Sequence, residues 1–381
     1  MEKERQSRIK KGLLGGVLVF LLLPMIQGAL NIFELEPLKG AIAATEKPVF
    51  TKYGWKTGEF QQQYETYLNN TFGFRSLLIR LNNQQAYSFY NEARANGVII
   101  GKDNYLYEEN YIRAWQGTDF SGEAAIREQV YKLKQIQDTL KKLHKDLLVV
   151  FAPGKASFFP EFLPDTCKQR KDGRTNYKSY VSEMKGQGIN YLDFNRWFRK
   201  MKPVSKYPLY GKCGIHWSKY GEFLAADSLI NTIGKMRNTA MSRWVQDRIE
   251  VRKENSPEDN DIGEGMNLLF KIGTYPMAYP VYHLEKTRAK QPKVLVVADS
   301  YYWGMFNAGL SRDIFDNGQF WYYNENIYPD SFEKVKTVAG IRINEGIEAH
   351  DMVVIICTDA NLYKFAFGFI DQAYNAYFPA K

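Results

Sequence analysis

Residues 293–303 read Lys-Val-Leu-Val-Val-Ala-Asp-Ser-Tyr-Tyr-Trp and begin with the clearest buried strand in the sequence. Its apolar run stops abruptly at Asp299 and Ser300. A continuous apolar run bounded by turn residues is typical of a strand that is buried on both faces of a parallel sheet. Similar runs occupy residues 147–151 and 351–357. The sequence therefore predicts a mostly parallel sheet that contains these three strands.

Segments with helical periodicity alternate with the apolar runs. Residues 121–144 carry apolar side chains on one helical face, and Ser121 is a candidate N-cap. Residues 174–187 precede a short apolar run at 189–192, and residues 219–236 follow the candidate N-cap Ser218. The apolar face of the first helix consists of Ile126, Val130, Leu133, Leu140 and Leu143. This alternation predicts an α/β fold whose sheet is flanked by helices on both faces.

The length of 381 residues fits one large α/β domain with an insertion. We assign residues 1–33 to a basic cytoplasmic stub and a transmembrane anchor, and residues 34–95 to a linker and a helical segment. The α/β domain is expected over residues 96–381, with a charged, irregular insertion at about 237–290. Two short apolar runs within residues 97–107 predict a hairpin at its start.

The N-terminus has the pattern of a membrane anchor. Five basic and two acidic residues precede Gly12, and the 22 residues from Gly12 to Phe33 carry no charge. As a helix they would span about 33 Å, enough for a hydrocarbon core of about 30 Å. The basic flank places the rest of the chain outside the cytoplasm. A cleavable signal peptide is the alternative, with Ala41-Ile42-Ala43 as its best cleavage site. In both cases the body of the protein is exported.

Composition and charge limit the partners and sites that the sequence supports. The net charge is +9, but after Phe33 the chain carries 46 basic and 40 acidic residues without a basic run, which argues against nucleic acid as a partner. Four histidines and three cysteines leave little room for a metal cluster. The cysteines Cys167, Cys213 and Cys357 permit one disulfide in an exported chain. Aromatic residues reach 15%, an excess that serves cores and also sugar stacking.

Chemistry in parallel α/β folds collects beyond the carboxyl ends of the strands. His144 and His350 precede strands and so fall at the amino edge, and His283 falls in the insertion. His216 remains, just before a helix whose N-terminus disfavours the imidazolium and would keep this base neutral. Ser300 directly follows a strand, as nucleophilic serines do. A structural histidine and a turn serine are the alternative interpretations.

Two motifs resemble blocks of the AlgJ/AlgX-type family of SGNH hydrolase-like polysaccharide O-acetyltransferases, also called DHHW proteins. Val297-Ala-Asp-Ser-Tyr301 resembles the Gly-Asp-Ser block, and Gly214-Ile-His-Trp-Ser218 resembles the Asp-x-His-Trp-Thr block. The histidine block precedes the serine block in that family, as it does here. Four more similar segments are Trp55-Lys-Thr-Gly-Glu-Phe60, Asn70-Thr-Phe-Gly-Phe-Arg75, Gly101-Lys-Asp-Asn-Tyr-Leu-Tyr107 and Phe151-Ala-Pro-Gly-Lys155.

The resemblance implies an extracytoplasmic, single-pass protein of the inner membrane that acetylates an exported polysaccharide. It implies Ser300 as nucleophile, His216 as general base, an acyl-enzyme and an oxyanion held by backbone N–H groups near Ser300. A membrane-bound O-acyltransferase is the implied acetyl donor, and neither a metal nor a soluble cofactor is needed. A carbohydrate acetylesterase would use the same residues.

The chain departs from the family pattern at Ala298, in place of Gly, and at Gly214, in place of the triad Asp. Loss of the triad charge costs serine proteases about 10⁴ in kcat. Three interpretations are open. Another carboxylate orients His216, with the strand-end residues Asp193, Asp299 and Asp359 as candidates; or a Ser–His dyad suffices; or the protein is a degenerate glycan-binding or scaffold subunit.

Several other residues are candidates for the site. Trp217, Tyr301 and Tyr302 (and Trp303) could stack on sugar rings, and Lys155 could contact an anionic substrate. Core packing and a solvated loop lysine are the respective alternatives. Cys213 is a remote alternative nucleophile, because a small buried residue is the commoner role for such a cysteine.

Overall fold

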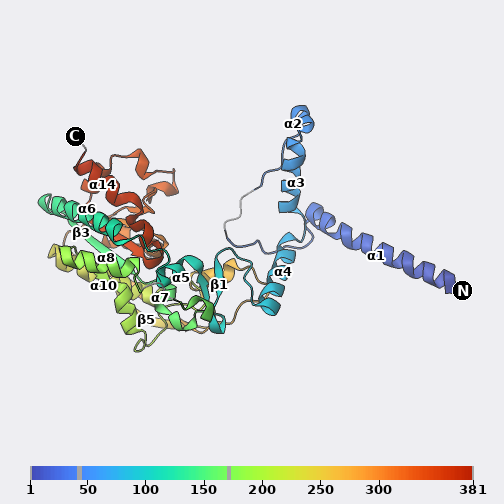
Figure 1. Ribbon diagram of the computed structural model, residues 1–381, viewed down its shortest axis with the longest axis horizontal. Coiled ribbons are helices and arrows are strands. Elements are labelled where there is room, and N and C mark those ends of the chain that lie inside the picture. The colour runs from blue at the N-terminus through green and yellow to red at the C-terminus, as the bar shows by residue number, and fades with distance from the viewer. Residues whose placement is uncertain (1, 41–44, 170–172, 380–381) are drawn as a thin grey trace. The chain divides into compact units, whose positions relative to one another are not determined.

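The computed structural model describes residues 2–40, 45–169 and 173–379 (Figure 1). The chain divides into two compact units, Met1–Asn96 with Gly263–Lys271, and Gly97–Ile262 with Ile272–Lys381. The candidate cleavage site at 41–43 lies outside the described residues.

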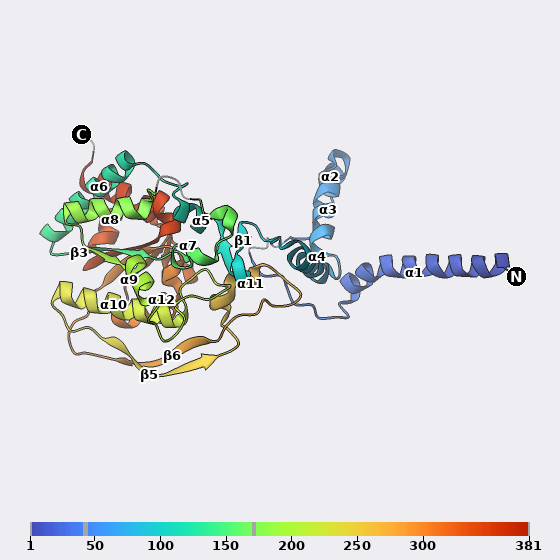
Figure 2. The same ribbon diagram turned by 60° about the horizontal axis from the view of Figure 1, so that its bottom comes forward.

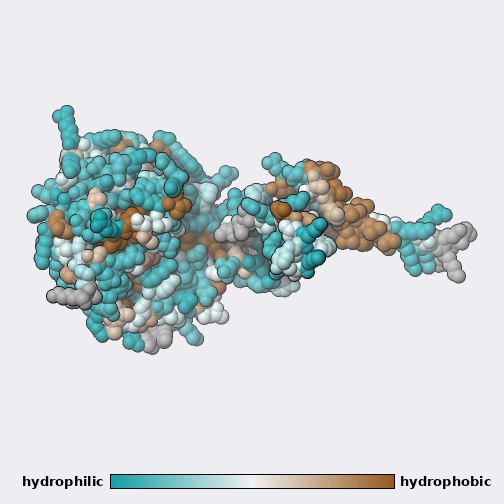
Figure 3. Space-filling model, turned by 90° about the horizontal axis from the view of Figure 1, so that it is seen from above, coloured by the Kyte–Doolittle hydropathy of each residue, from teal (hydrophilic) through white to brown (hydrophobic). Residues whose placement is uncertain are grey.

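The N-terminal unit is helical. Helix α1 (Glu2–Leu30) is long and apolar enough to cross a membrane, with a mean hydropathy of 2.2 in its most apolar window, and its apolar surface is visible in Figure 3. Near its end, Pro24 O accepts a hydrogen bond of 3.1 Å from Gly73 N. The other helices are α2 (Lys52–Thr57), α3 (Glu59–Thr71) and α4 (Arg75–Tyr90). Residues 263–271 join this unit through contacts such as the 2.9 Å hydrogen bond from Asn83 Nδ2 to Met266 O.

A six-stranded sheet with the order β4-β3-β10-β7-β8-β9 forms the centre of the second unit. The first five strands are mutually parallel, and β9 pairs with β8 in antiparallel fashion. The strands are β3 (Asp146–Ala152), β4 (Tyr191–Asp193), β7 (Val294–Ala298), β8 (Phe320–Tyr322), β9 (Asn326–Tyr328) and β10 (Met352–Thr358). The three strands that the apolar runs predict are therefore the three central ones, because only a strand covered on both faces can be apolar throughout.

Helices cover both faces of this sheet, and Figure 2 shows α6 and α8 on one side and α10 on the other. Their bounds are α6 (Glu123–Lys142), α8 (Asn176–Gln187) and α10 (Lys219–Arg237). Further helices are α5 (Glu109–Gln116), α7 (Lys155–Phe158), α9 (Phe194–Met201), α12 (Trp303–Asn307), α13 (Ile343–Glu348) and α14 (Phe369–Tyr377). The predicted hairpin is present as β1 (Val98–Ile100) and β2 (Leu106–Glu108). The expected α/β architecture is confirmed.

Local expectations differ from the structure at the ends of α6. Gly122, with φ 91°, is the N-cap in place of Ser121. Leu143 lies beyond the helix and is 41% exposed, because the chain turns there towards β3. The face that consists of Ile126, Val130, Leu133 and Leu140 is fully buried, as its spacing predicts.

The segment at 237–290 is more ordered than its sequence indicates. It contains an antiparallel ribbon of β5 (Arg243–Arg252) and β6 (Met277–Glu285), and α11 (Asp261–Gly265) lies in their connection. A two-stranded ribbon buries little surface, so the alternation of apolar and polar residues along its strands is weak. Trp244 is one of its few buried side chains.

The three cysteines are all among the described residues and are free thiols, so the disulfide that the composition permits is not formed.

Candidate active site

Ser300 lies at the carboxyl edge of the sheet, directly after β7. The preceding residue, Asp299, is fully buried and fixes this strand end. Its carboxylate accepts hydrogen bonds from Tyr301 N at 3.1 Å, from Thr358 N and Oγ1 at 2.9 Å, and from Asn361 Nδ2 at 2.8 Å. Asp299 thus ties the ends of β7 and β10 together and holds the serine turn in place.

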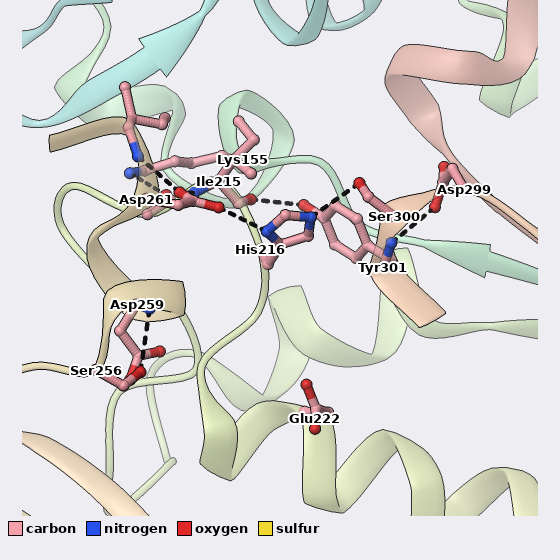
Figure 4. Close-up of polar contacts among 12 residues, drawn as sticks. Lys155, Ile215, His216, Glu222, Ser256, Asp259, Asp261, Asp299, Ser300 and Tyr301 are labelled. Atoms are coloured by element: carbon pink, nitrogen blue, oxygen red, sulfur yellow. Dashed lines mark hydrogen bonds and ion pairs between the residues drawn. The ribbon is translucent and has the colours of Figure 1, made fainter. Parts of the chain in front are cut away.

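His216 reaches Ser300 from the loop that precedes α10. Ser218 caps this helix as expected, accepting a 3.0 Å hydrogen bond from Gly221 N. His216 Nε2 lies 2.9 Å from Ser300 Oγ, and both residues are partly exposed (Figure 4). The structure therefore brings together the serine and the histidine that the strand-end argument selects.

The other ring nitrogen of His216 contacts a carboxylate that the sequence did not single out. His216 Nδ1 lies 2.8 Å from Asp261 Oδ2, at the first residue of α11. Asp261 Oδ1 accepts hydrogen bonds of 2.8 Å from the backbone N–H groups of Ile215 and Ile262, which fixes the carboxylate in orientation. Ser300, His216 and Asp261 form a continuous chain of hydrogen bonds, the arrangement of a Ser-His-Asp triad (Figure 4).

The electrostatics at His216 differ from the expectation based on the helix N-terminus. Burial opposes its protonation, but the hydrogen bond and negative charge of Asp261, with smaller contributions from Asp299 and Glu108, outweigh it, so the pKa of His216 is raised. The nearby carboxylate dominates because it contacts the ring directly, whereas the helix dipole acts through partial charges. The imidazolium form of His216 is thus stabilised by Asp261.

Gly214 explains why the acid comes from another segment. A Cβ atom at this position would lie 2.6 Å from the backbone oxygen of Asp259, so no side chain fits. Residues 259–261 instead pack against the loop and deliver Asp261. Lys155 Nζ donates hydrogen bonds to Lys212 O at 2.7 Å and Gly214 O at 2.6 Å. Both sets of contacts hold the histidine loop.

We expect Gly214→Ala to lower the free energy of unfolding by about 1–3 kcal/mol, because the added methyl group overpacks the contact with Asp259. Gly186→Ala is the matched control, since a Cβ at Gly186 meets nothing within 4 Å and the residue lies inside α8. This control is expected to be neutral or stabilising. Chemical denaturation measures both changes, and equal effects of the two substitutions would contradict the close packing at Gly214.

The three strand-end carboxylates expected to orient His216 have other partners. Asp193 accepts a 2.8 Å hydrogen bond from Tyr177 Oη and caps α9 through Arg196 N. Asp359 accepts from Ser157 Oγ and from Asn195 Nδ2, and burial raises its pKa to about 6. Asp299 holds the serine turn, as described above. All three carboxylates lie at the carboxyl edge of the sheet, but the hydrogen-bond partner of His216 Nδ1 is Asp261.

Three of the four aromatic side chains expected to stack on sugar are buried, and the fourth, Trp303, is partly exposed. Trp217 is 3% exposed, Tyr301 1%, and Tyr302 and Lys155 0%, so none of them offers a face to a substrate. Tyr301 instead supports the site, because its hydroxyl donates to Ile215 O at 2.7 Å and its ring lies 4.9 Å from that of His216. Burial lowers the pKa of Lys155 to about 7, and its role is to hold the histidine loop.

Two further possibilities are a nucleophilic Cys213 and a metal site. Cys213 is buried, its Sγ lies 3.9 Å from Asn104 O, and burial raises the pKa of its thiol, which disfavours a nucleophilic thiolate. Within the described part of the chain, no group of three or more His, Cys, Asp or Glu side chains could hold a metal ion.

Comparison with known proteins shows what this chain is similar to. Residues 98–262 match the family described as the SGNH hydrolase-like domain of acetyltransferase AlgX. The chain is 20% identical over 180 residues to the probable alginate O-acetylase AlgJ of Pseudomonas putida, a match that covers 47% of this chain and 44% of that relative. The matched segment carries the hairpin, His216 and Asp261.

Solved structures give a weaker likeness. The O-acetyltransferase domain of Pseudomonas putida AlgJ is 17% identical with a TM-score of 0.47, over 73% of this chain and 99% of that one. Pseudomonas aeruginosa AlgX is 15% identical with a TM-score of 0.42, over 72% of this chain and 67% of that one. Bacillus cereus PatB1 is 13% identical with a TM-score of 0.43, over 71% and 99%. The resemblance drawn from the motifs is confirmed over the matched segment, which is similar to the SGNH hydrolase-like domain of acetyltransferase AlgX.

Proposed function

We propose that this protein is a membrane-anchored, extracytoplasmic O-acetyltransferase that acts on an exported polysaccharide through an acetyl-Ser300 intermediate. The observation that carries the proposal is the chain of hydrogen bonds from Ser300 Oγ through His216 to Asp261, with distances of 2.9 and 2.8 Å. A nucleophile, a base and an acid that orients the base are the complete set of side chains that acyl transfer by this mechanism requires.

The geometry supports one role for each residue in the proposed reaction. His216 Nε2 takes the proton of Ser300 as Oγ attacks the acetyl carbonyl carbon of the donor, and Asp261 stabilises the imidazolium through Nδ1–H. Collapse of the tetrahedral intermediate returns this proton to the leaving group and leaves acetyl-Ser300. A sugar hydroxyl then attacks the ester, His216 takes its proton, and the second collapse returns that proton to Ser300 while the acetylated sugar leaves.

Similarity to AlgJ and the composition of α1 support the proposed substrate and location. AlgJ is a probable alginate O-acetylase, which supports a polysaccharide acceptor for this chain. Helix α1, whose basic residues precede its apolar stretch, supports a single-pass anchor in the inner membrane and a domain on the outer side. A membrane-bound O-acyltransferase is the proposed acetyl donor, since an exported enzyme has no access to cytoplasmic acetyl donors.

Acetyl transfer by the detergent-solubilised full chain tests this function. With p-nitrophenyl acetate as donor and oligosaccharides from bacterial exopolysaccharides, alginate included, as acceptors, mass spectrometry is expected to detect acetylated oligosaccharide. Release of acetate with no acetylated sugar would instead identify an acetylesterase. Neither product, with no acetylated serine, would leave a glycan-binding or scaffold subunit.

A further inference from the structure

A close backbone contact joins the end of α1 to the junction between α3 and α4. Gly73, at this junction, donates a 3.1 Å hydrogen bond from its N–H to Pro24 O. A Cβ atom at Gly73 would lie 2.5 Å from Gly28 N, so the two chain segments touch without intervening side chains. Just beyond, the rings of Phe33 and Phe74 lie 6.0 Å apart. These contacts fix the junction against the last turns of α1.

The junction lies at the outer end of the apolar stretch of α1. From Gly12 to Leu30 this helix is about 28 Å long, close to the hydrocarbon core of about 30 Å. Pro24 and Gly28 fall in its last two turns, away from the basic residues. With α1 across a bilayer, the junction is therefore at the outer interface. Both views show α2 and α3 running crosswise to α1 from this point, so these helices would lie along the membrane surface (Figures 1 and 2).

Residues 49–56, which include most of α2, expose large apolar side chains. Lys52 and Lys56 are exposed among them. Tryptophan and tyrosine are enriched where proteins meet the headgroup region of a bilayer, and lysine beside such rings is typical of segments that lie in this interface. Four large apolar side chains of the segment are more than half exposed: Val49, Phe50, Tyr53 and Trp55.

The exposed rings are held in place by the fold. Thr51 caps α2 by accepting a 3.0 Å hydrogen bond from Gly54 N. The Phe50 ring lies 5.9 Å from the Trp55 ring and meets the Phe60 ring edge to face at 5.2 Å. An ordered apolar patch that faces water is typical of an interaction surface. Because its rings are already ordered, binding would cost little conformational entropy.

We propose that the patch at residues 49–56 inserts into the outer interface of the membrane that α1 crosses, as a second membrane contact of the chain. The inference rests on the membrane anchor of the proposed function. A lipid surface is the partner that the observations favour, because the contact with Gly73 keeps this unit beside the end of α1. The rings of Trp55 and Phe50 can reach the acyl boundary while Lys52 and Lys56 meet anionic headgroups.

Trp55 makes a direct test possible, because it is the only tryptophan in residues 1–96. The full chain is reconstituted into vesicles of phosphatidylethanolamine and phosphatidylglycerol whose acyl chains carry bromine just below the headgroups. We expect bromine to quench part of the tryptophan emission of the parent protein. Trp55→Phe keeps an apolar ring and is expected to abolish this quenched part. Trp197→Phe, in α9 and partly exposed, is the matched control and is expected to retain it.

Flotation of the vesicles separates this inference from the anchor. A parent protein that does not float with them would overturn the proposed anchor and this inference with it. A parent protein that floats, but is quenched to the same extent as Trp55→Phe, would overturn only the lipid contact of residues 49–56. That result is expected where a second copy, a protein partner or another part of the chain covers the patch. Stronger quenching by bromine at the bilayer centre would overturn the interfacial depth.

Discussion

Ser300→Ala is expected to lower kcat for acetyl transfer by about 10⁶-fold, the loss found when a serine protease loses its nucleophile or its base. No oxygen remains at 2.9 Å from His216 Nε2 to form the acyl bond. Stopped-flow kinetics with p-nitrophenyl acetate measures the rate, and peptide mass spectrometry shows whether the acetyl group is attached to residue 300.

His216→Ala is expected to have a loss of similar size, and the double variant to be no worse, because the two residues act as a unit. Ser182→Ala, on the exposed face of α8, is the control and is expected to match the parent rate. An acetylated serine elsewhere in the Ser300→Ala protein would contradict the assignment of the nucleophile.

Asp261→Asn is expected to lower kcat by about 10⁴, because an amide can hold the ring but cannot stabilise the imidazolium. The pH profile should move as well. The base works when neutral, so activity falls as pH drops through the raised pKa of His216. Without the Asp261 charge, burial lowers that pKa, and the acidic limb of the profile shifts to lower pH.

Asp193→Asn and Asp359→Asn are the matched controls for this prediction. Both carboxylates lie at the carboxyl edge of the sheet, but their hydrogen bonds go to residues other than His216. We expect each substitution to leave the acidic limb in place. A shift of the limb by either control equal to that of Asp261→Asn would show that Asp261 is not the group that raises the pKa of His216.

The pairing of Ser300 with His216 could be predicted from the sequence, because the relevant physics is local. Apolar runs identify the central strands, and the carboxyl ends of parallel strands share one edge. We therefore expect a serine directly after one strand and a histidine before a capped helix to meet at this edge of the sheet. Because the chain has only four histidines, few other candidates for the base remained.

Asp261 could not be found in this way. It lies 45 residues after His216 in a charged connection without periodicity, and its position depends on the packing of the Asp259 carbonyl against Gly214. The one signal was Gly214 itself, a residue without a side chain where an acid was expected. The glycine indicates that another segment packs where a side chain would lie, but the sequence does not identify that segment.

The aromatic residues show the same limit of prediction from the sequence. Tyr301 and Tyr302 follow the nucleophile in sequence, and they are buried because the chain turns into the core after β7. Tyr323 lies 23 residues away from Ser300 in sequence, yet the parallel pairing of β7 with β8 brings its backbone N–H within 2.9 Å of Ala298 O, at the end of the strand that leads to the serine. Proximity along the chain was a poor guide to proximity in the site.

The contact between Gly214 and the Asp259 carbonyl bears on how degenerate relatives are recognised. A survey that tests for an acid two residues before the histidine would classify this chain as a pseudoenzyme. Here the glycine admits a second segment, and that segment carries the carboxylate to within 2.8 Å of the ring. A missing residue in a sequence motif can therefore mark an acid that another segment supplies, and only the spatial arrangement reveals it.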